Sequence, residues 1–349
     1  MQFTHDWLPQ RVRFATGGAT EAVVEEVRRL GASLVMAIAS DAARAEPVLS
    51  GVPVEVLHTD VAMHVPVEVA ERARAVAADH VVDAIVCVGG GSTTGLAKAV
   101  ALTSGLPIVA VPTTYAGSEA TDVWGLTEHG RKTTGVDPRV LPRTVVYDAG
   151  LMLTLPVPTS VASAFNALAH CVDSMWAPRS DPVDRALAVE GIRALRTGLP
   201  RVVEDPMELE GREQTLYGAY LAAVAFASAG SGLHHKICHV LGGMFGLPHA
   251  ETHTVVLPYV VALNAPFVPE FDRRMADALG TTSALDGIQA LRDETAAPRS
   301  LRDLGLLEAD VPRAVQPILE AAPPSNPAPA TADSVEALLR AAWEGKEPG

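Results

Sequence analysis

Histidine is concentrated in one short stretch of this 349-residue chain, because five of its eleven histidines lie between His234 and His253. His235 and His239 are four residues apart in a segment of helical periodicity, so they share one face of a predicted helix. Asn166 and His170 have the same spacing in an earlier predicted helix. An isolated histidine is usually a hydrogen-bonded structural residue. Two such pairs on separate helices instead predict a shared cleft, where imidazoles can bind a metal, orient a substrate or transfer a proton.

Two further histidines extend this cluster. His249 follows His235 by fourteen residues in the segment LPHAETH, which we expect to be a loop, and His253 lies four residues further on. The spacing therefore predicts that both belong to the same functional cleft. The candidate catalytic histidines are His170, His235, His239 and His249, and the candidate substrate-binding residues are these four with Asn166 and His253.

The elements that must position these side chains fall into two regions. Up to about residue 150, short apolar runs rich in β-branched residues alternate with helical patterns such as 67–79, which is typical of a parallel sheet with helices on both faces. The runs are 33–39, 54–57, 84–88, 107–111 and, after a turn-rich segment at 130–143, 144–148. Helical periodicity then dominates, for example over 160–174, 184–195, 214–229 and 233–244. We expect an α/β dinucleotide-binding domain over 1–153 and an all-helical substrate domain over 154–349.

The run at 84–88 leads directly into GGGSTTGLAK, which opens a predicted helix at 92–103. Glycines let the backbone approach a phosphate, and the N–H groups of a helix N-terminus bind the anion, with Ser92 as the expected cap. The next strand ends in PTTYAGSEAT, at a strand end where open α/β sheets bind ligands. The motif is not the GxGxxG fingerprint, and the plain alternative is a tight strand-to-helix turn. The candidate cofactor residues here are Gly90, Gly91, Ser92, Thr113, Thr114 and Ser118.

Charge and composition exclude several classes of partner. The formal net charge of −14 argues against a nucleic acid or an anionic membrane, because the chain has no basic excess to neutralise phosphates. The N-terminus lacks the pattern of a secretory signal, and no apolar stretch is long enough to span a bilayer. Cys87, Cys171 and Cys238 show no paired spacing, which fits a reducing compartment and a packing role. We expect a cytoplasmic globular protein.

Two motifs carry a resemblance to a known family. FNALAHCVDS and LHHKICHVLGGMFGLPHAETHTVVLP resemble the iron-containing alcohol dehydrogenase superfamily, which shares its architecture with dehydroquinate synthase. LPQRVRFATG, GGGSTTGLAKA, PTTYAGSEAT and GRKTTGVDP are similar to one branch of it, the maleylacetate reductases. The resemblance covers nearly the whole chain. It implies an α/β nucleotide-binding domain followed by an all-α domain.

The same resemblance bears on a metal. In metal-dependent members of the superfamily, the corresponding helix positions and loop supply an Asp and three His to a divalent ion. Asn166 stands where those members have the Asp, and an amide oxygen is a poor substitute for a carboxylate. Three histidines and a water could still hold zinc. The resemblance to the maleylacetate reductases implies a metal-independent enzyme.

The implied reaction is the NADH- or NADPH-dependent reduction of the carbon–carbon double bond of maleylacetate to 3-oxoadipate. Hydride would add at the alkene carbon β to the ketone, an enolate would form, and the neighbouring carbon would take a proton. The cluster would then stabilise the oxygen and protonate the carbon. We expect His239 or His170 to be the proton donor, with the other histidines binding the small dicarboxylate substrate.

The remaining expectations concern the cofactor and the alternatives. Lys132 matches a position that contacts cofactor in the superfamily and is also a catalytic candidate, while Asp41 at a strand end would bind a ribose and favour NADH over NADPH. The resemblance implies a homodimer. The rival readings are a metal-dependent alcohol or aldehyde dehydrogenase of the same superfamily, a dehydroquinate-synthase-like lyase, and a non-catalytic binding protein.

Overall fold

The computed structural model describes residues 2–128 and 131–348, and for Arg131 and Lys132 it describes the backbone alone. The chain divides into two compact units, Trp7–Leu155 and Met1–Asp6 with Pro156–Gly349. The division after Leu155 lies two residues beyond the predicted boundary at 153. The predicted α/β domain included residues 2–6. They group with the helical unit, where Nδ1 of His5 lies 2.8 Å from Oδ2 of the buried Asp181.

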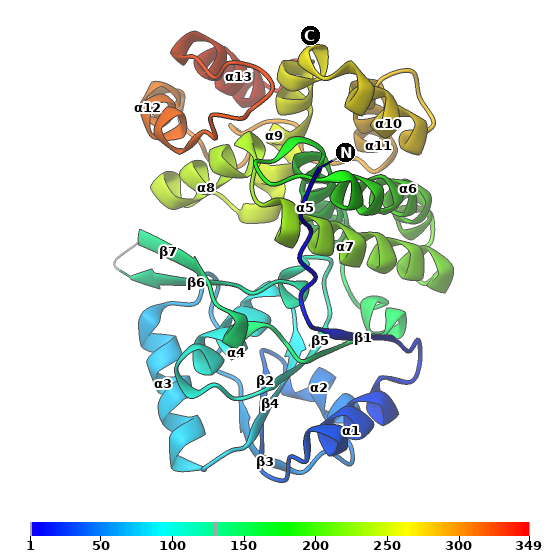
Figure 1. Ribbon diagram of the computed structural model, residues 1–349, viewed down its shortest axis with the longest axis vertical. Helices are drawn as coiled ribbons and strands as arrows, with labels where there is room; N and C mark the ends of the chain where they lie inside the picture. The colour runs from blue at the N-terminus through cyan, green and yellow to red at the C-terminus, as the bar shows by residue number, and fades with distance from the viewer. Residues whose placement is uncertain (1, 129–130, 349) are drawn as a thin grey trace. The chain divides into compact units, whose positions relative to one another are not determined.

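The α/β unit is built on a six-stranded sheet in the order β1-β8-β5-β4-β2-β3, and every neighbouring pair is parallel (Figure 1). Its strands are β1 (Arg11–Phe14), β2 (Val35–Ala39), β3 (Val54–His58), β4 (Ala84–Gly89), β5 (Ile108–Pro112) and β8 (Thr144–Tyr147). All residues of β2, β4, β5 and β8 are buried, as in strands covered on both faces. The predicted fold class is confirmed. The strand β1 was not predicted from the sequence.

Helices cover this sheet in two pairs, because α1 packs with α2 and α3 packs with α4. Alternate residues of β2, which are Val35, Ala37 and Ala39, share one apolar core with α1 and α2. These helices are α1 (Ala19–Leu30), α2 (Ala42–Leu49), α3 (Val67–Asp79) and α4 (Gly91–Ser104). Short 3-10 turns follow at η1 (Ser118–Ala120), η2 (Pro138–Val140) and η3 (Ala149–Met152).

A second, two-stranded antiparallel sheet was not expected. It pairs β6 (Val123–Glu128) with β7 (Arg131–Val136). The segment predicted to be turn-rich therefore contains a strand, apart from Gly130, which lies outside the described residues. RKTTGV lacks the alternation of apolar residues that indicates a strand. It forms a strand because its backbone pairs with β6.

The helical unit is organised around α5 (Val157–Trp176), which packs against α6, α7, α8 and α9. Every residue of α5 from Ser160 to Trp176 is buried. The remaining elements are α6 (Pro182–Glu204), α7 (Leu209–Ala229), α8 (Leu233–Phe245), α9 (His249–Asn264), η4 (Ala265–Phe267), α10 (Pro269–Leu279), α11 (Ala284–Glu294), η5 (Glu308–Asp310), α12 (Val311–Ala321) and α13 (Ala332–Glu344). Among the described residues, no single helix is long and apolar enough to cross a bilayer, and α7 with α8 meets that criterion only as a pair bent by 97°.

The contact between α6 and α7 depends on glycine. A Cβ atom on Gly198 would lie 2.6 Å from the backbone nitrogen of Thr215 and 2.7 Å from the carbonyl oxygen of Gly211. These neighbours are backbone atoms of α7, so they cannot move aside as a side chain would. α6 continues to Glu204, beyond Leu195, where the sequence pattern predicts that it ends.

We predict that Gly198→Ala lowers the free energy of unfolding by about 1–3 kcal/mol, because the new methyl group overlaps the backbone of α7. Gly243→Ala is the matched control, since a Cβ there meets nothing within 4 Å. That control should leave stability unchanged or raise it by up to about 1 kcal/mol. Urea unfolding followed by circular dichroism measures both, and a Gly198→Ala variant as stable as the parent would contradict the prediction.

Candidate functional site

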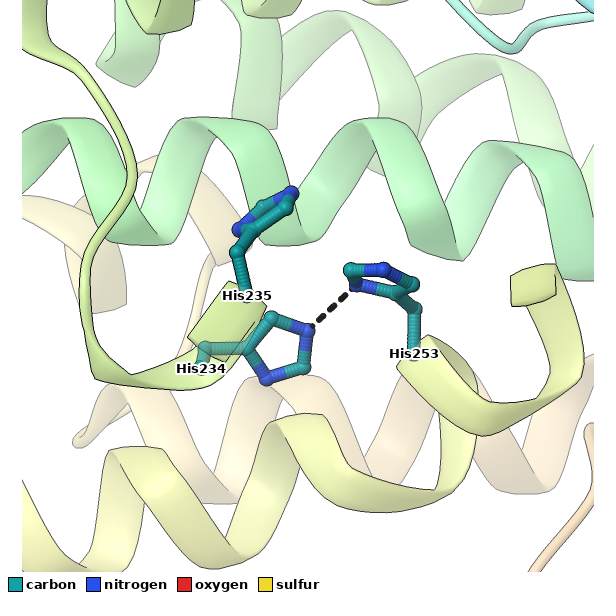
Figure 2. Close-up of side chains that lie close together, drawn as sticks. All are labelled: His234, His235 and His253. Carbon is teal, nitrogen blue, oxygen red and sulfur yellow. Dashed lines mark hydrogen bonds between the residues drawn. The ribbon is translucent and has the colours of Figure 1, made fainter. Parts of the chain in front are cut away.

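The predicted histidine cluster forms in the helical unit, where α5, α8 and α9 meet (Figure 2). The ring of His235 on α8 lies 4.9 Å from that of His170 on α5 and 4.6 Å from that of His253 on α9, between centroids. All three side chains are buried. Phe226 of α7 covers the cluster, 4.6 Å from His170 and 4.3 Å from His235. Three imidazoles from three helices therefore share one buried environment.

His239 and His249 form the outer edge of this cluster. His239 is exposed and its ring lies 6.0 Å from that of His235, whereas the partly buried His249 lies 6.1 Å from His239 and 4.4 Å from His253. The expectation that His249 lies in a loop is wrong, because it is the first residue of α9. Pro248 immediately before it reads as a turn signal but is also compatible with a helix start. As a result, His249 and His253 share one helix face.

His234 is a member of the cluster that the sequence analysis did not select. Its Nε2 lies 2.8 Å from Nδ1 of His253 and 3.7 Å from Sγ of Cys238, and its side chain is fully buried. Figure 2 shows the hydrogen bond between the two rings. The only sequence signal was its position next to His235. The hydrogen bond to His234 therefore helps to fix the orientation of the His253 ring.

Asp173 is the second residue that the sequence analysis missed. Its Oδ2 lies 2.7 Å from Nδ1 of His235, and it accepts hydrogen bonds from the backbone N–H groups of Gly232 at 2.9 Å and His235 at 3.2 Å. The side chain is fully buried. Its signal was present, since Asp173 lies two helical turns after Asn166 on the same face of α5. No carboxylate was expected there.

Burial dominates the electrostatics of the cluster. It lowers the pKa of His170 to about 3 and that of His234 to about 3, and it holds the pKa of His253 well below the ordinary value. These three imidazoles are therefore neutral at neutral pH. Burial likewise raises the pKa of Asp173 to about 7, although Lys236 and the backbone donors of α8 oppose that shift.

Several buried polar atoms of the cluster have no hydrogen-bond partner among the described residues. They are Oδ1 of Asn166, Nδ1 of His170, Oδ1 of Asp173, Nδ1 of His234, Nε2 of His235 and Nε2 of His253. Asn166 is 4% exposed and lies one turn before His170 on α5. Leaving such atoms unsatisfied costs about 1–3 kcal/mol each, which marks them as a site for a polar ligand.

The predicted nucleotide-binding segments lie side by side in the α/β unit, since Gly89 of β4 pairs with Pro112 of β5. The N–H of Thr113 donates to the carbonyl of Gly89 at 3.0 Å. A Cβ on Gly90 would lie 2.9 Å from the side chain of Thr114, and one on Gly91 would lie 3.5 Å from Ala116. The close contact with Thr114 therefore favours glycine at position 90, whereas a Cβ at position 91 would make only an ordinary contact. The N–H groups of the first turn of α4 follow directly, and such groups can bind an anion.

Two details of that prediction change. Gly90 is the N-cap of α4, so Ser92 is the second helical residue and not the cap. Lys98 was not selected, yet its fully buried ammonium donates to the carbonyls of Ser118, Thr121 and Val123 at 2.6–2.8 Å. Burial lowers the pKa of Lys98 to about 7 against the attraction of nearby carboxylates. Lys98 therefore fixes the loop that contains Ser118.

The other cofactor candidates have different outcomes. Asp41 stands at the end of β2 as expected, but its carboxylate caps α2 through the N–H of Arg44 at 3.2 Å and forms an ion pair with that side chain. Lys132 lies in β7, and its side chain is outside the described residues. The structure thus brings together two of the predicted groups, the histidine cluster in one unit and the glycine-rich turn with the PTTYAGS loop in the other.

Because these imidazoles stay neutral in the folded chain, we predict that the free energy of unfolding falls steeply at acid pH. As the pH falls below about 6.5, the unfolded chain protonates His170, His234 and His253. In the folded chain His170 and His234 stay neutral to about pH 3, and burial holds the pKa of His253 well below its ordinary value. The free energy of unfolding should therefore fall by about 1.4 kcal/mol per pH unit for each imidazole. Thermal unfolding between pH 7.5 and 5 measures the slope. His234→Gln should reduce it, the exposed His80→Gln should not, and a midpoint independent of pH would refute the account.

Comparisons with known proteins agree with this division of the chain. The profile described as iron-containing alcohol dehydrogenase matches residues 9–149, and that described as Fe-containing alcohol dehydrogenase family, C-terminal, matches residues 160–343. The chain is 43% identical to the maleylacetate reductase of Delftia acidovorans, over 100% of this chain and 99% of that protein.

Solved structures give the same result. An iron-containing alcohol dehydrogenase from Corynebacterium glutamicum is 57% identical with a TM-score of 0.98, over 100% of this chain and 98% of that one. A maleylacetate reductase from Rhizobium sp. strain MTP-10005 is 40% identical with a TM-score of 0.94, over the full length of both chains. The resemblance inferred from the motifs is confirmed. The chain belongs to the iron-containing alcohol dehydrogenase family.

Proposed function

We propose that this enzyme reduces the carbon–carbon double bond of maleylacetate to 3-oxoadipate. The observation that carries the proposal is Asn166, a buried neutral amide beside imidazoles whose nitrogens lack partners, where metal-dependent relatives would need a carboxylate. Full-length identity of 43% to proteins named maleylacetate reductase supports the same reaction. The C. glutamicum relative, named an iron-containing alcohol dehydrogenase, favours a metal-dependent alcohol dehydrogenase as the second candidate.

The chemistry sets what the residues must do. A bound reduced nicotinamide supplies a hydride, which forms a new C–H bond at the alkene carbon β to the ketone. The π electrons of the alkene move to give an enolate, and one proton then adds to the neighbouring carbon. The enzyme must hold two carboxylates, stabilise the developing charge on the enolate oxygen and deliver that proton.

The histidine cluster meets the first two requirements. Three ring nitrogens are buried without partners among the described residues: Nδ1 of His170, Nε2 of His235 and Nε2 of His253. Hydrogen bonds to a bound polyanion would remove the free-energy cost of leaving these nitrogens unpaired. An N–H on one of these buried nitrogens would interact strongly with a developing negative charge.

The third requirement favours His239 over His170 as the proton donor. Burial lowers the pKa of His170 to about 3, so this ring does not hold the extra proton that an imidazolium acid needs. His239 is exposed and can exchange protons with solvent, and it stands at the edge of the cluster. Of our two sequence-based candidates, we therefore propose His239.

The family name implies iron, but the donor set does not fit a divalent metal. Asn166 supplies no charge, and the carboxylate of Asp173 is engaged by His235 and by the start of α8. His234, His235 and His253 offer ligand atoms within 4.8 Å of one another. However, the hydrogen-bonded nitrogens of His234 and His253 are 2.8 Å apart, whereas two nitrogens around a tetrahedral zinc are about 3.4 Å apart. We propose catalysis without a metal.

The α/β unit fits a dinucleotide. Gly90 lets the Thr114 side chain approach the N-terminus of α4, whose first-turn N–H groups could bind a pyrophosphate, and Lys98 fixes the loop that contains Ser118. Asp41 would favour NADH, but its partner Arg44 could balance a 2′-phosphate. We propose that both NADH and NADPH are used. The homodimer and the cytoplasmic location remain predictions.

The activity test uses freshly generated maleylacetate and follows NADH absorbance, with simple aldehydes as comparison substrates. We expect turnover with maleylacetate alone, unchanged after incubation with EDTA, and far less than one metal ion per chain by elemental analysis. Absence of NADH oxidation would remove the proposed reaction. Activity lost with EDTA and restored by Fe²⁺ or Zn²⁺ would remove the metal-free part and favour the second candidate.

Restoring the missing carboxylate tests the role of Asn166. Asn166→Asp should bind Zn²⁺ or Fe²⁺ at least about tenfold more tightly than the parent, because a charged oxygen ligand replaces a neutral one. Equilibrium dialysis with elemental analysis measures the affinity, and Asn166→Ala is the control without a ligand atom. Equal metal affinity in the parent and Asn166→Asp would show that the amide is not what excludes the metal.

A further inference from the structure

Lys98 places a buried cation beneath the β5–β6 loop (residues 113–122), which contains several of the candidate cofactor residues. It lies in a run of buried residues on α4. Its Nζ donates to three backbone carbonyl oxygens, those of Ser118, Thr121 and Val123. We propose that Lys98 is a positioning residue for the nicotinamide cofactor, because it holds this loop beside the helix that would bind the pyrophosphate. This inference rests on the proposed use of NADH and NADPH.

The acceptors around Lys98 match the three protons of an ammonium group. Nζ lies 2.6 Å from the carbonyl oxygen of Ser118 and 2.8 Å from those of Thr121 and Val123, so each N–H group has a carbonyl acceptor. The hydroxyl oxygen of Thr121 is a fourth contact at 3.1 Å. Hydrogen bonds from a charged donor are about twice as strong as neutral ones. An apolar side chain could fill the same space, but it would leave these oxygens without this donor.

The anchor and the proposed phosphate site belong to the same helix. α4 begins at Gly91, and Lys98 follows about two helical turns later. The N–H groups of the first turn and the ammonium therefore move together. At the start of the loop, the N–H of Thr113 donates to the carbonyl of Gly89 at 3.0 Å, just before α4. Both ends of the loop are thus hydrogen-bonded to the segment that offers the phosphate-binding N–H groups.

Two other side chains hold the middle of the loop from the sheet. Nε2 of Gln10, just before β1, donates to the carbonyl of Glu119 at 2.8 Å. The hydroxyl of Tyr147, at the end of β8, donates to the Glu119 carboxylate at 2.9 Å. Loss of the Lys98 ammonium would keep these contacts but remove its hydrogen bonds from α4 to the end of the loop. We expect Ser118, a candidate cofactor residue, then to lose its fixed distance from the first turn of α4.

Lys98→Met removes the ammonium and keeps an unbranched side chain in the buried position. We expect the Kd for NADH to rise about tenfold or more, because the loop must then be ordered on binding. The kcat at saturating NADH and the KM for maleylacetate should stay within about twofold, because the loop contacts are equal in the ground and transition states. Titration of NADH fluorescence at about pH 6.5 measures Kd, since burial lowers the pKa of Lys98 to about 7 and the ammonium predominates below it. An unchanged Kd would overturn the proposal.

Arg74 on α3 provides a matched control. Its Nε and Nη2 also donate to a carbonyl of α4, that of Ala99, at 3.0 and 2.9 Å. Arg74→Met should therefore leave the Kd for NADH unchanged. Hydrogen–deuterium exchange without cofactor then locates the effect of Lys98→Met. The amides of residues 118–123 should exchange faster than in the parent, and those of α3 should not. Faster exchange throughout the α/β unit would indicate a general loss of stability and would refute the positioning role.

Gly117→Ala covers the case in which Lys98→Met does not fold. Gly117 has a φ of +78°, so alanine there strains the same loop without removing a buried charge. The Kd for NADH should rise about fivefold. Gly105→Ala is the control, because Gly105 has a φ of +72° at the other end of α4 and a Cβ there meets nothing within 4 Å.

An unchanged Kd in Gly117→Ala would contradict the proposal, since the position of the loop would then not affect affinity. An equal rise in Gly105→Ala would contradict it as well, because strain outside the loop would have the same effect. These titrations need no maleylacetate, so their result is independent of whether maleylacetate is the substrate.

Discussion

The contact between Asp173 and the start of α8 is the interaction on which the histidine cluster depends. One carboxylate oxygen accepts two backbone N–H groups and faces Nδ1 of His235, so a single buried atom fixes the helix and the ring together. α8 also contributes His234 and His239, and their positions follow from where that helix begins. An error at this contact would displace three imidazoles at once.

The rest of the cluster reflects the cost of burying charge. His170, His234 and His253 are kept neutral by desolvation, and Asn166 adds a neutral amide where a carboxylate would attract a cation. The result is a set of polar atoms with little net charge and unsatisfied hydrogen-bonding capacity. Such polar groups are already desolvated and held in place, so they are available to a polar ligand.

In the α/β unit, too, a buried ionisable side chain forms hydrogen bonds to backbone groups, but there the side chain is a lysine. The buried ammonium of Lys98 donates to three loop carbonyls, as the buried carboxylate of Asp173 accepts from backbone N–H groups. In each unit, one charged side chain satisfies backbone groups that would otherwise lack partners and so shapes a binding segment. Both residues were missed for the same reason: a single Lys or Asp in an apolar helix has no local pattern that reveals its partners.

What the sequence determined by itself is local. Spacing of four residues placed His235 with His239 and Asn166 with His170 on shared helix faces, and GGGSTT after an apolar run marked the turn before α4. These follow from helical periodicity and from the backbone freedom of glycine, which neighbours along the chain decide. Only the tertiary structure brought Asp173 to His235, sixty-two residues away, and drew His249 into the first turn of α9. Such contacts depend on which helices pack together and at what depth, and burial then decides which side chains keep a charge.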